Sequence, residues 1–214
     1  MIKYALIDLD ETLYPRSAGV LQQVGQRIER YLVERMGMTP AQAAALRVDY
    51  RDRYGTTLGG LRVHYTANTA DYLAFVHDVP IEQLLQPDPE LDAVLSTLPW
   101  ECVIFTNSYR PHVERVLCAL GIRQHFFRIF DVIAMGYKQK PDPAAYRHVL
   151  TGLGAEAAEC LLADDSLGNL IPAKALGMTT VWVGPHAGPV PGVDFAIPEV
   201  KAIRRVAECV MRKA

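Results

Sequence analysis

The sequence has no excess of charge of one sign. Its 214 residues include 24 acidic and 22 basic side chains, which gives a formal net charge of -2. The lysines and arginines are scattered and form no basic block. Proteins that bind nucleic acids or anionic membranes usually gather positive charge on one face. We therefore expect neither a nucleic-acid polymer nor a membrane as a partner, and chemistry on a small molecule becomes the leading expectation.

Long apolar runs are also missing. Runs such as 160–163 and 179–183 are far shorter than the roughly 18 residues that a membrane-spanning helix needs. Near the N-terminus, Asp8, Asp10 and Glu11 follow the apolar run 4–7 before the apolar core of a signal peptide could form. The expected location is cytoplasmic.

The cysteine and histidine spacings of metal and redox sites are absent as well. The four cysteines form no C-x-x-C pair, and the six histidines form no H-x-x-x-H or H-E-x-x-H pattern. A zinc site therefore has little support. The cysteines are expected to be reduced and to serve as small apolar residues in strands and helices.

The chain does contain short apolar runs that end in polar residues. These runs are 4–7, 102–105, 132–134, 161–163 and 181–183. Their length and continuity predict strands that are buried on both faces. Helical patterns with proline or glycine boundaries lie between them, at 111–121, 143–152 and 169–177. This alternation predicts an α/β fold, with a parallel sheet covered by helices on both faces.

One region breaks the alternation. Residues 15–87 show helical patterns at 20–36, 41–54 and 68–77, without a convincing buried strand. The turn residues 87–89, with sequence PDP, mark the return to the α/β pattern. We therefore expect a core made of residues 1–14 and 88–214, with a small helical domain inserted at 15–87.

Polar residues of unusual chemistry follow three of the predicted strands. They are the segments 8–12 (DLDET), 106–108 (TNS) and 164–165 (DD), and a lysine in the segment 140–143 (KPDP) joins the set. The carboxyl ends of parallel strands meet at one edge of the sheet, so these residues are expected to lie together. Crowded carboxylates need a cation, and a site of oxygen ligands alone favours Mg²⁺.

The two aspartates of the first segment suggest a division of labour. Residues two apart in an extended segment point the same way, so Asp8 and Asp10 can face one phosphoryl group. One carboxylate can attack while the other handles protons. With a divalent ion, Lys140 and the Thr106 hydroxyl, the site would receive a phosphate dianion.

These motifs, in this order, resemble the haloacid dehalogenase superfamily over nearly the whole chain. The inserted helices resemble the cap domain of the class that places it between the first and second motifs, over a Rossmann-like core. More narrowly, the segments 8–15 (DLDETLYP), 54–61 (YGTTLGGL), 84–88 (LLQPD) and 104–108 (IFTNS) resemble the pyrimidine 5′-nucleotidase branch. Glu11 is a small departure, because many members have aspartate there.

The resemblance implies a role for each core motif. Asp8 is the expected nucleophile, which takes the phosphoryl group as an aspartyl-phosphate. Asp10 is the expected general acid for the leaving alkoxide, and then the base that activates water. Lys140 offsets negative charge, while the Thr106 hydroxyl and the Asn107 backbone N–H hold a phosphoryl oxygen.

The resemblance also implies a magnesium site. The expected ligands are the Asp8 carboxylate, the Asp10 main-chain carbonyl and Asp165. Asp164 is expected to act through a water, although the sequence leaves open which of these two neighbouring aspartates binds directly.

Recognition of the leaving group is expected to come from the cap and its surroundings, because the core residues are used on phosphate and metal. The candidates are Tyr14 near the junction of core and cap, His64 and Tyr65 after a glycine pair, and Tyr109 and Arg110 after the second motif. Each of these residue types also has a common structural role, as core packing for aromatics and as a solvated charge for arginine.

The expected function is that of a Mg²⁺-dependent phosphomonoesterase that acts on nucleoside 5′-monophosphates as a monomer or homodimer. The alternatives are a sugar-phosphate or phosphoglycolate phosphatase, a phosphomutase and, outside enzymes, a phosphate-binding regulatory module. Dehalogenation is disfavoured by Asp10, because relatives that release a halide, which needs no proton, lack this second aspartate.

Overall fold

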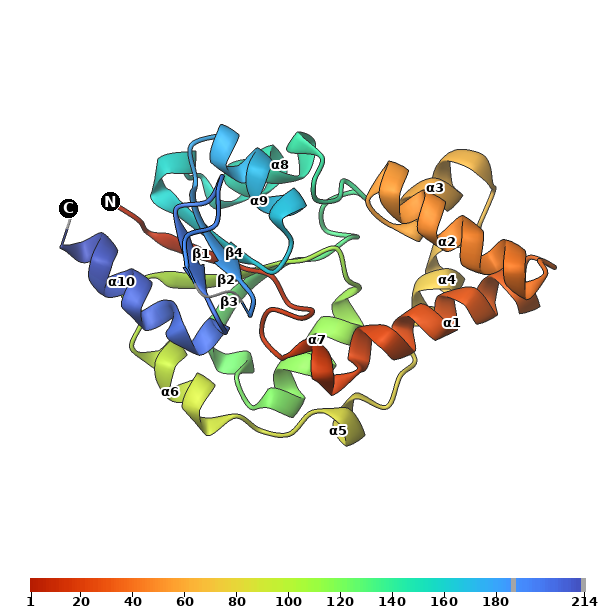
Figure 1. The fold of residues 1–214 in the computed structure, drawn as a ribbon, viewed down its shortest axis with the longest axis horizontal. Coiled ribbons are helices and arrows are strands. Elements are labelled where there is room, and N and C mark those ends of the chain that lie inside the picture. Colours follow the sequence, from red (N-terminus) through yellow and green to blue (C-terminus); the bar gives the residue numbers. More distant parts are fainter. Residues whose placement is uncertain (186–187, 213–214) are drawn as a thin grey trace. The chain divides into compact units, whose positions relative to one another are not determined.

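The computed structural model describes residues 1–185 and 188–212. The chain forms two compact units, shown as a ribbon in Figure 1. The first consists of Met1–Pro15 and Leu85–Ala214, and the second consists of Arg16–Leu84. The second unit is therefore an insertion between the first strand of the core and the rest of the core.

A six-stranded parallel sheet forms the centre of the first unit, in the order β3-β2-β1-β4-β5-β6. The strands are β1 (Tyr4–Ile7), β2 (Glu101–Phe105), β3 (Phe126–Phe130), β4 (Cys160–Asp164), β5 (Thr179–Val183) and β6 (Phe195–Ile197). The predicted parallel α/β fold is confirmed. In the register of the three central strands, Ile7 of β1 lies opposite Ile104 of β2 and Ala163 of β4. Residues just beyond these positions therefore reach the same edge of the sheet.

One predicted strand is wrong. The apolar run 132–134 lies in a series of turns, and the third strand is β3, which ends at Phe130, before this run begins. Arg128 interrupts the apolar pattern of β3, which hid the strand in the sequence. Val132 is nevertheless fully buried. Its neighbours Ile133 and Ala134 are exposed, so a short apolar run here does not mark a strand buried on both faces.

Helices cover both faces of this sheet, as the sequence predicts. Figure 1 shows α8 (Pro143–Leu153) and α9 (Leu167–Ala175) on one side, and α6 (Pro89–Ser96), α7 (Arg110–Leu120) and α10 (Ile203–Met211) on the other. The α8 and α9 side has an apolar core that joins Leu6 and Phe105 of the sheet to Tyr146 and Leu170 of the helices. The sheet is therefore buried on both faces, which explains why its strands read as continuous apolar runs.

The inserted unit is helical. It contains α1 (Val20–Glu34), α2 (Pro40–Tyr54), α3 (Thr57–His64), α4 (Thr69–Val76) and the short α5 (Ile81–Leu84), and residues 16–84, all of them described, include no strand. Thr39 begins α2 with a capping box to Gln42. Tyr31, Tyr50, Leu61 and Tyr72 contribute to its own buried core. The unit therefore has the helical character that the sequence predicts for the insert.

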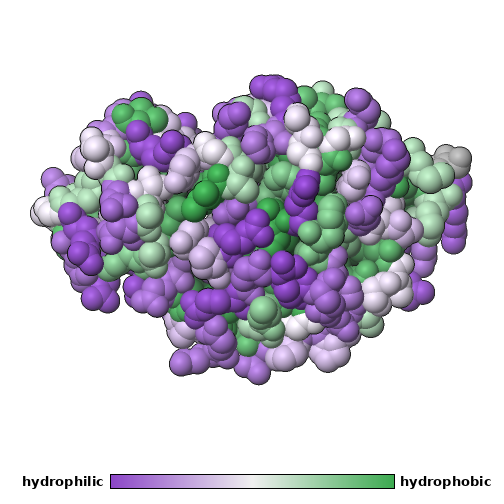
Figure 2. Space-filling model, turned by 180° about the vertical axis from the view of Figure 1, so that it is seen from behind, coloured by the Kyte–Doolittle hydropathy of each residue, from purple (hydrophilic) through white to green (hydrophobic). Residues whose placement is uncertain are grey.

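One face of the molecule is mostly polar. On the face shown in Figure 2, hydrophilic residues predominate and apolar ones are scattered among them. Across the described residues, the helices are all too short or too polar to cross a lipid bilayer.

Candidate active site

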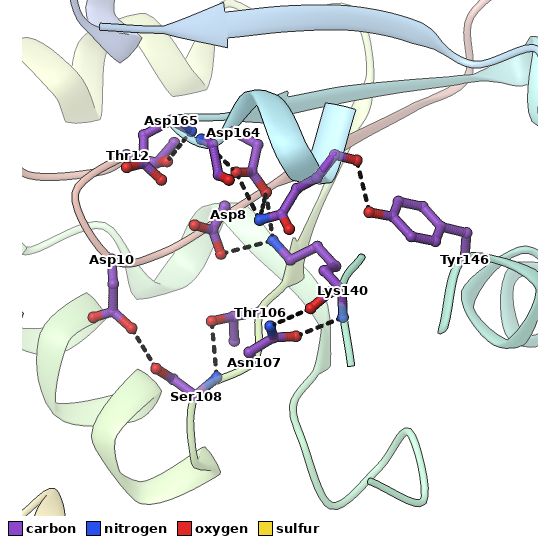
Figure 3. Close-up of polar contacts among 12 residues, drawn as sticks. Asp8, Asp10, Thr12, Thr106, Asn107, Ser108, Lys140, Tyr146, Asp164 and Asp165 are labelled. Atoms are coloured by element: carbon purple, nitrogen blue, oxygen red, sulfur yellow. Dashed lines mark hydrogen bonds and ion pairs between the residues drawn. The ribbon is translucent and has the colours of Figure 1, made fainter. Parts of the chain in front are cut away.

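Buried polar residues gather where the central strands end. Asp8 follows β1, Thr106 follows β2, and Asp164 is the last residue of β4. Their exposed fractions are 7%, 1% and 0%, respectively. The backbone fixes their positions, because the Asp8 N–H donates to the Ala163 carbonyl at 2.9 Å and the Thr106 N–H donates to the Phe130 carbonyl at 3.0 Å. Sequence reasoning placed these residues together, and Figure 3 shows them side by side.

Lys140 places its ammonium group between two of these carboxylates. Its Nζ lies 2.9 Å from Asp8 Oδ1 and 2.6 Å from Asp164 Oδ2, and the residue is 1% exposed. Burial alone would lower the pKa of Lys140, but Asp164 and Asp8 outweigh this effect and raise it above its ordinary value. Lys140 therefore stays charged and forms a buried ion pair with each carboxylate.

Asn107 holds the main chain of Lys140. The Asn107 Nδ2 donates to the Lys140 carbonyl, and the Lys140 N–H donates to Asn107 Oδ1, both at 2.8 Å. The Asn107 side chain thus fixes the loop that carries the ammonium group, while only its main chain was predicted to have a role. The neighbouring Thr106 Oγ1 accepts from the Ser108 N–H at 3.1 Å, which leaves the hydroxyl proton of Thr106 to be donated elsewhere.

Both carboxylate oxygens of Asp164 have partners within the protein. Oδ1 accepts from the Ser166 N–H at 2.9 Å and from Asn169 Nδ2 at 3.0 Å, and Oδ2 accepts from Lys140 Nζ. Asn169 is held in turn by the Tyr146 hydroxyl, which donates to its carbonyl at 2.6 Å. Sequence reasoning missed Asn169 and Tyr146, since both lie within helices, α9 and α8, and not directly at the end of a strand.

The main chain of Asp165 is fixed from two sides. Its N–H donates to Thr12 Oγ1 at 3.1 Å, and its carbonyl accepts from the Trp182 indole N–H at 2.8 Å. Oxygen atoms of Asp8, Asp164 and Asp165 lie within 4.8 Å of one another. A group of carboxylate oxygens without sulfur or nitrogen suits Mg²⁺, so these residues fit the predicted cation.

The charge balance around Asp8 also suits a cation. Burial raises the pKa of Asp8 to about 8, with the charges of Asp164 and Asp10 acting in the same direction and Lys140 acting against them. Lys140 alone therefore does not fully offset the negative charge gathered around Asp8. A divalent ion beside Asp8 would supply the missing positive charge.

The carboxylate of Asp10 has three hydrogen-bond partners. Its Oδ1 accepts from the Tyr14 hydroxyl at 2.5 Å and lies 2.9 Å from His112 Nε2, and its Oδ2 accepts from the Ser108 hydroxyl. Burial alone would raise the pKa of Asp10, but these partners hold it well below its usual range, with His112 the strongest. Burial and the charge of Asp10 raise the pKa of Tyr14 well above its usual range, so the phenol keeps its proton.

Ser108 and His112 are the partners of Asp10 that sequence reasoning missed. Ser108 stood within the second motif but received no role. His112 lies one helical turn before Val116 on the buried side of α7 and is 1% exposed. A histidine at a position that the helical pattern predicts to be buried was the available signal.

The residues predicted to bind the leaving group lie in different environments. Tyr14 belongs to the core unit and contacts Asp10. Tyr109 is the residue before α7, and the guanidinium of Arg110 donates to the Ile129 carbonyl at 2.8 Å, which ties α7 to β3. His64 and Tyr65 lie in the inserted unit. There the His64 Nε2 is 2.5 Å from the Tyr54 hydroxyl, whereas Tyr65 is 43% exposed.

Solved structures share this fold. A haloacid dehalogenase-type phosphatase from Thermococcus onnurineus aligns with a TM-score of 0.61 and 20% identity, covering 96% of this chain and 97% of that one. The L-2-haloacid dehalogenase from Xanthobacter autotrophicus, with chloropropionic acid covalently bound, aligns with a TM-score of 0.63 and 18% identity. That alignment covers 97% of this chain and 99% of the dehalogenase. At this identity the likeness concerns the fold.

Curated relatives include two proteins that are 28% identical. One is Phosphate metabolism protein 8 of Saccharomyces cerevisiae, matched over 191 residues, which are 82% of this chain and 60% of the yeast protein. The other is a phosphoglycolate phosphatase of Neisseria gonorrhoeae, matched over 165 residues, which are 71% of this chain and 69% of that enzyme. The chain thus spans about three fifths to two thirds of the length of these relatives.

The family assignment comes from a sequence profile that covers most of the chain. The profile of the haloacid dehalogenase-like hydrolases matches residues 2–177, a span that includes all four motifs and the inserted helical unit. On this match, and with the site just described, the chain belongs to the haloacid dehalogenase-like hydrolase family.

Proposed function

We propose that the protein is a Mg²⁺-dependent phosphomonoesterase that acts through an aspartyl-phosphate on Asp8. The observation that carries this proposal is the buried Lys140 ammonium, which lies within 2.9 Å of Asp8 Oδ1 and 2.6 Å of Asp164 Oδ2. A carboxylate attacks an anionic phosphate only when positive charge offsets the repulsion between them. Lys140 supplies part of this charge beside the proposed nucleophile.

The proposed reaction has two steps. An Asp8 carboxylate oxygen forms a bond to phosphorus while the ester P–O bond breaks. The leaving oxygen takes a proton that Asp10 binds in the substrate complex, where the negative charge of the phosphate favours the protonated carboxyl group. Asp10 then removes a proton from water as the water oxygen attacks phosphorus, which breaks the bond to Asp8 and releases inorganic phosphate. Lys140 and the Thr106 hydroxyl hold the phosphoryl oxygens in both steps.

Magnesium has a defined place in this proposal. The Asp8 carboxylate, the Asp165 carboxylate and the Asp10 main-chain carbonyl would hold it. When bound, it supplies positive charge that offsets the substrate dianion and the carboxylates. Asp164 is assigned an indirect role, because Lys140, Ser166 and Asn169 already occupy its oxygens.

Asp10 favours phosphate esters over organic halides as substrates. A halide leaves as a stable anion and needs no general acid, whereas an alkoxide needs a proton. In this chain a second aspartate lies two residues after Asp8 and makes three hydrogen bonds. The proposal therefore keeps phosphoryl transfer, although one of the similar folds belongs to a dehalogenase.

For the substrate class, we infer that small phosphorylated acids or sugars fit better than nucleotides. Two further relatives, from Neisseria meningitidis and Yersinia pseudotuberculosis, are also named phosphoglycolate phosphatases, and the second is 26% identical over 83% of this chain. These names favour the alternative of the sequence analysis over its first choice. Nucleoside 5′-monophosphates remain the second candidate, supported by the segments 8–15 and 104–108.

A substrate panel tests this proposal. Purified protein with Mg²⁺ is given 2-phosphoglycolate, several sugar phosphates, UMP, CMP and 2-chloropropionate, and released phosphate or chloride is measured. We expect phosphate release from phosphoglycolate or a sugar phosphate at the highest kcat/KM, and none from Asp8→Asn. A preference for UMP or CMP would reverse the order of substrates. Isomerisation without phosphate release would indicate a mutase, and binding without turnover would reject the enzymatic proposal.

A further inference from the structure

The hydrogen bonds to Asp10 confine its carboxylate on both oxygens. Tyr14 and His112 contact Oδ1, at 2.5 Å and 2.9 Å, and Ser108 donates to Oδ2. The Tyr14 and Ser108 hydroxyls donate, and Nε2 of His112 is the third donor in the tautomer that carries its proton there. The three donors approach two different oxygens, so rotation of the carboxylate about its own axis would break at least one hydrogen bond.

The three donors are themselves held in place. Tyr14, Ser108 and His112 are 3%, 8% and 1% exposed. The Ser108 N–H donates to Thr106 Oγ1 at 3.1 Å, and the Ser108 carbonyl accepts from the Val132 N–H at 3.0 Å. The side chain of His112, in the first turn of α7, is 0% exposed, so the surrounding atoms limit its rotamers. The donors therefore form a rigid frame.

We propose that Tyr14, Ser108 and His112 are positioning residues that orient Asp10 for proton transfer to the leaving oxygen. This inference rests on the proposed function, in which Asp10 is the general acid and base. Proton transfer is efficient only when the carboxyl oxygen is held at hydrogen-bonding distance and angle from the leaving group. The assignment also gives Tyr14 a role at Asp10 in place of the predicted contact with the leaving group.

A purely structural role would have a different signature. Donors that only satisfy a buried charge would change stability, and they would slow every substrate by the same factor. Donors that orient a general acid matter most when the leaving group needs a proton. An alkyl phosphate requires that proton, whereas p-nitrophenyl phosphate releases a stabilised phenolate and needs little help.

The test measures the rate of Asp8 phosphorylation by rapid quench, with an alkyl and an aryl phosphate. The alkyl substrate is 2-phosphoglycolate or UMP, whichever the wild type hydrolyses faster, and the aryl substrate is p-nitrophenyl phosphate. General acid catalysis contributes roughly 10²- to 10⁴-fold, so partial loss of orientation is expected to cost about 10-fold. We expect this loss with the alkyl ester for Tyr14→Phe and Ser108→Ala, and a change under about 2-fold with the aryl ester.

His112 allows a rescue experiment at one position. His112→Leu removes the donor and is expected to slow the alkyl ester by about 10- to 100-fold. In His112→Gln an amide N–H replaces the Nε2 donor and should recover most of that loss. His125→Leu is the matched control, because His125 Nε2 lies 2.6 Å from Asp92 Oδ1, a contact between residues that the proposal does not use. This control should change neither rate.

The outcomes distinguish failure of the positioning role from failure of the proposed function. Equal losses for both esters, or His112→Gln as slow as His112→Leu, would overturn the positioning role while wild-type phosphorylation of Asp8 still stood. Absence of Asp8 phosphorylation in the wild type would reject the proposed function itself. Tyr14→Phe removes a single oxygen from a buried ring, so it decides the question even where a His112 variant fails to fold.

Discussion

At the scale of single residues, burial of the Lys140 ammonium group costs desolvation free energy, and its ion pairs with buried carboxylates offset that cost. Removing one partner of a buried ion pair leaves an uncompensated charge and costs about 3–5 kcal/mol. Lys140→Met is therefore expected to lower the free energy of unfolding by about this amount, as measured with urea. Lys174→Met is the control, because its pair with Asp194 is 42% exposed on the lysine side and is expected to contribute at most about 1 kcal/mol. Equal effects of the two substitutions would contradict the buried ion pairs.

The raised pKa of Asp8 predicts a pH dependence of stability. Its folded pKa of about 8 lies above the unfolded value of about 3.9, so the folded state binds more protons between these limits. In EDTA, the free energy of unfolding contributed by Asp8 should therefore fall as the pH rises from about 4 to about 8. Asp8→Asn lacks this titration, so it should gain stability relative to the wild type over the same range. Urea unfolding at pH 5 and pH 8 checks this, and parallel changes in both proteins would refute it.

The sequence correctly brought side chains together where polar residues of unusual type stood at the ends of predicted strands. Asp8, Thr106 and Asp164 were placed together because each stands at or just beyond the end of a buried strand. His112 was missed because its contact with Asp10 depends on where α7 packs, which no local pattern reports. The contact of Tyr14 was missed for the same reason, since a buried tyrosine near a cap junction has several possible partners.

At the scale of elements, the packing of α3 against α2 leaves no room for a side chain at Gly60. A Cβ there would lie 2.2 Å from ring carbons of Tyr50. Gly60→Ala is expected to destabilise the inserted unit by about 1–3 kcal/mol through overpacking. Hydrogen exchange of the amides of α2 and α3 should then accelerate relative to the wild type.

Gly168→Ala provides the matched control for that substitution. It also lies in a helix, α9, but the nearest atom to its added Cβ is Ser166 Oγ at 3.6 Å, an ordinary contact. The free energy of unfolding of Gly168→Ala should equal that of the wild type or exceed it by up to about 1 kcal/mol. If the amides of α2 and α3 exchanged as slowly in Gly60→Ala as in Gly168→Ala, the close approach of these two helices would be wrong.

The strands that could be predicted are those with a strong local pattern in the sequence. The runs at 4–7, 102–105, 161–163 and 181–183 became β1, β2, β4 and β5, because buried parallel strands are continuously apolar. The third strand was misplaced because Arg128 interrupts it and a short apolar run in a turn follows it. The short β6 escaped prediction, since three residues at the edge of a sheet carry almost no periodic signal.

At the scale of the whole molecule, the acidic site predicts a dependence on divalent cations. Asp8, Asp164 and Asp165 together would repel a phosphate dianion in the absence of a cation. EDTA should therefore abolish phosphate release, and added Mg²⁺ should restore it. Mg²⁺ should also raise the Tm of the wild type, because a ligand that binds only the folded state stabilises it. Asp165→Asn should weaken this shift in Tm, and hydrolysis indifferent to EDTA would contradict the metal site.

The family could be predicted from the sequence, whereas the motifs leave the substrate open. The motifs carry the chemistry in a few residues whose types and order are distinctive. The proposed leaving-group contacts are aromatic residues such as Tyr65, and tyrosines also fill the core of the inserted unit, as Tyr31 and Tyr72 do. Composition and periodicity therefore do not separate a specificity residue from a packing residue.

The central claim is that Asp8 carries the phosphoryl group, and trapping that intermediate tests it most directly. Protein with Mg²⁺ is mixed with ³²P-labelled p-nitrophenyl phosphate and quenched in acid within milliseconds, and the label bound to the protein is counted. In a parallel unlabelled sample, borohydride reduces the acyl phosphate before digestion with trypsin, which releases the phosphate and leaves homoserine in place of the phosphorylated aspartate. We predict protein-bound label that rises and decays, homoserine at position 8 within the peptide 4–16, and neither in Asp8→Asn. Phosphate release by the wild type without label on Asp8, or label that persists in Asp8→Asn, would contradict it.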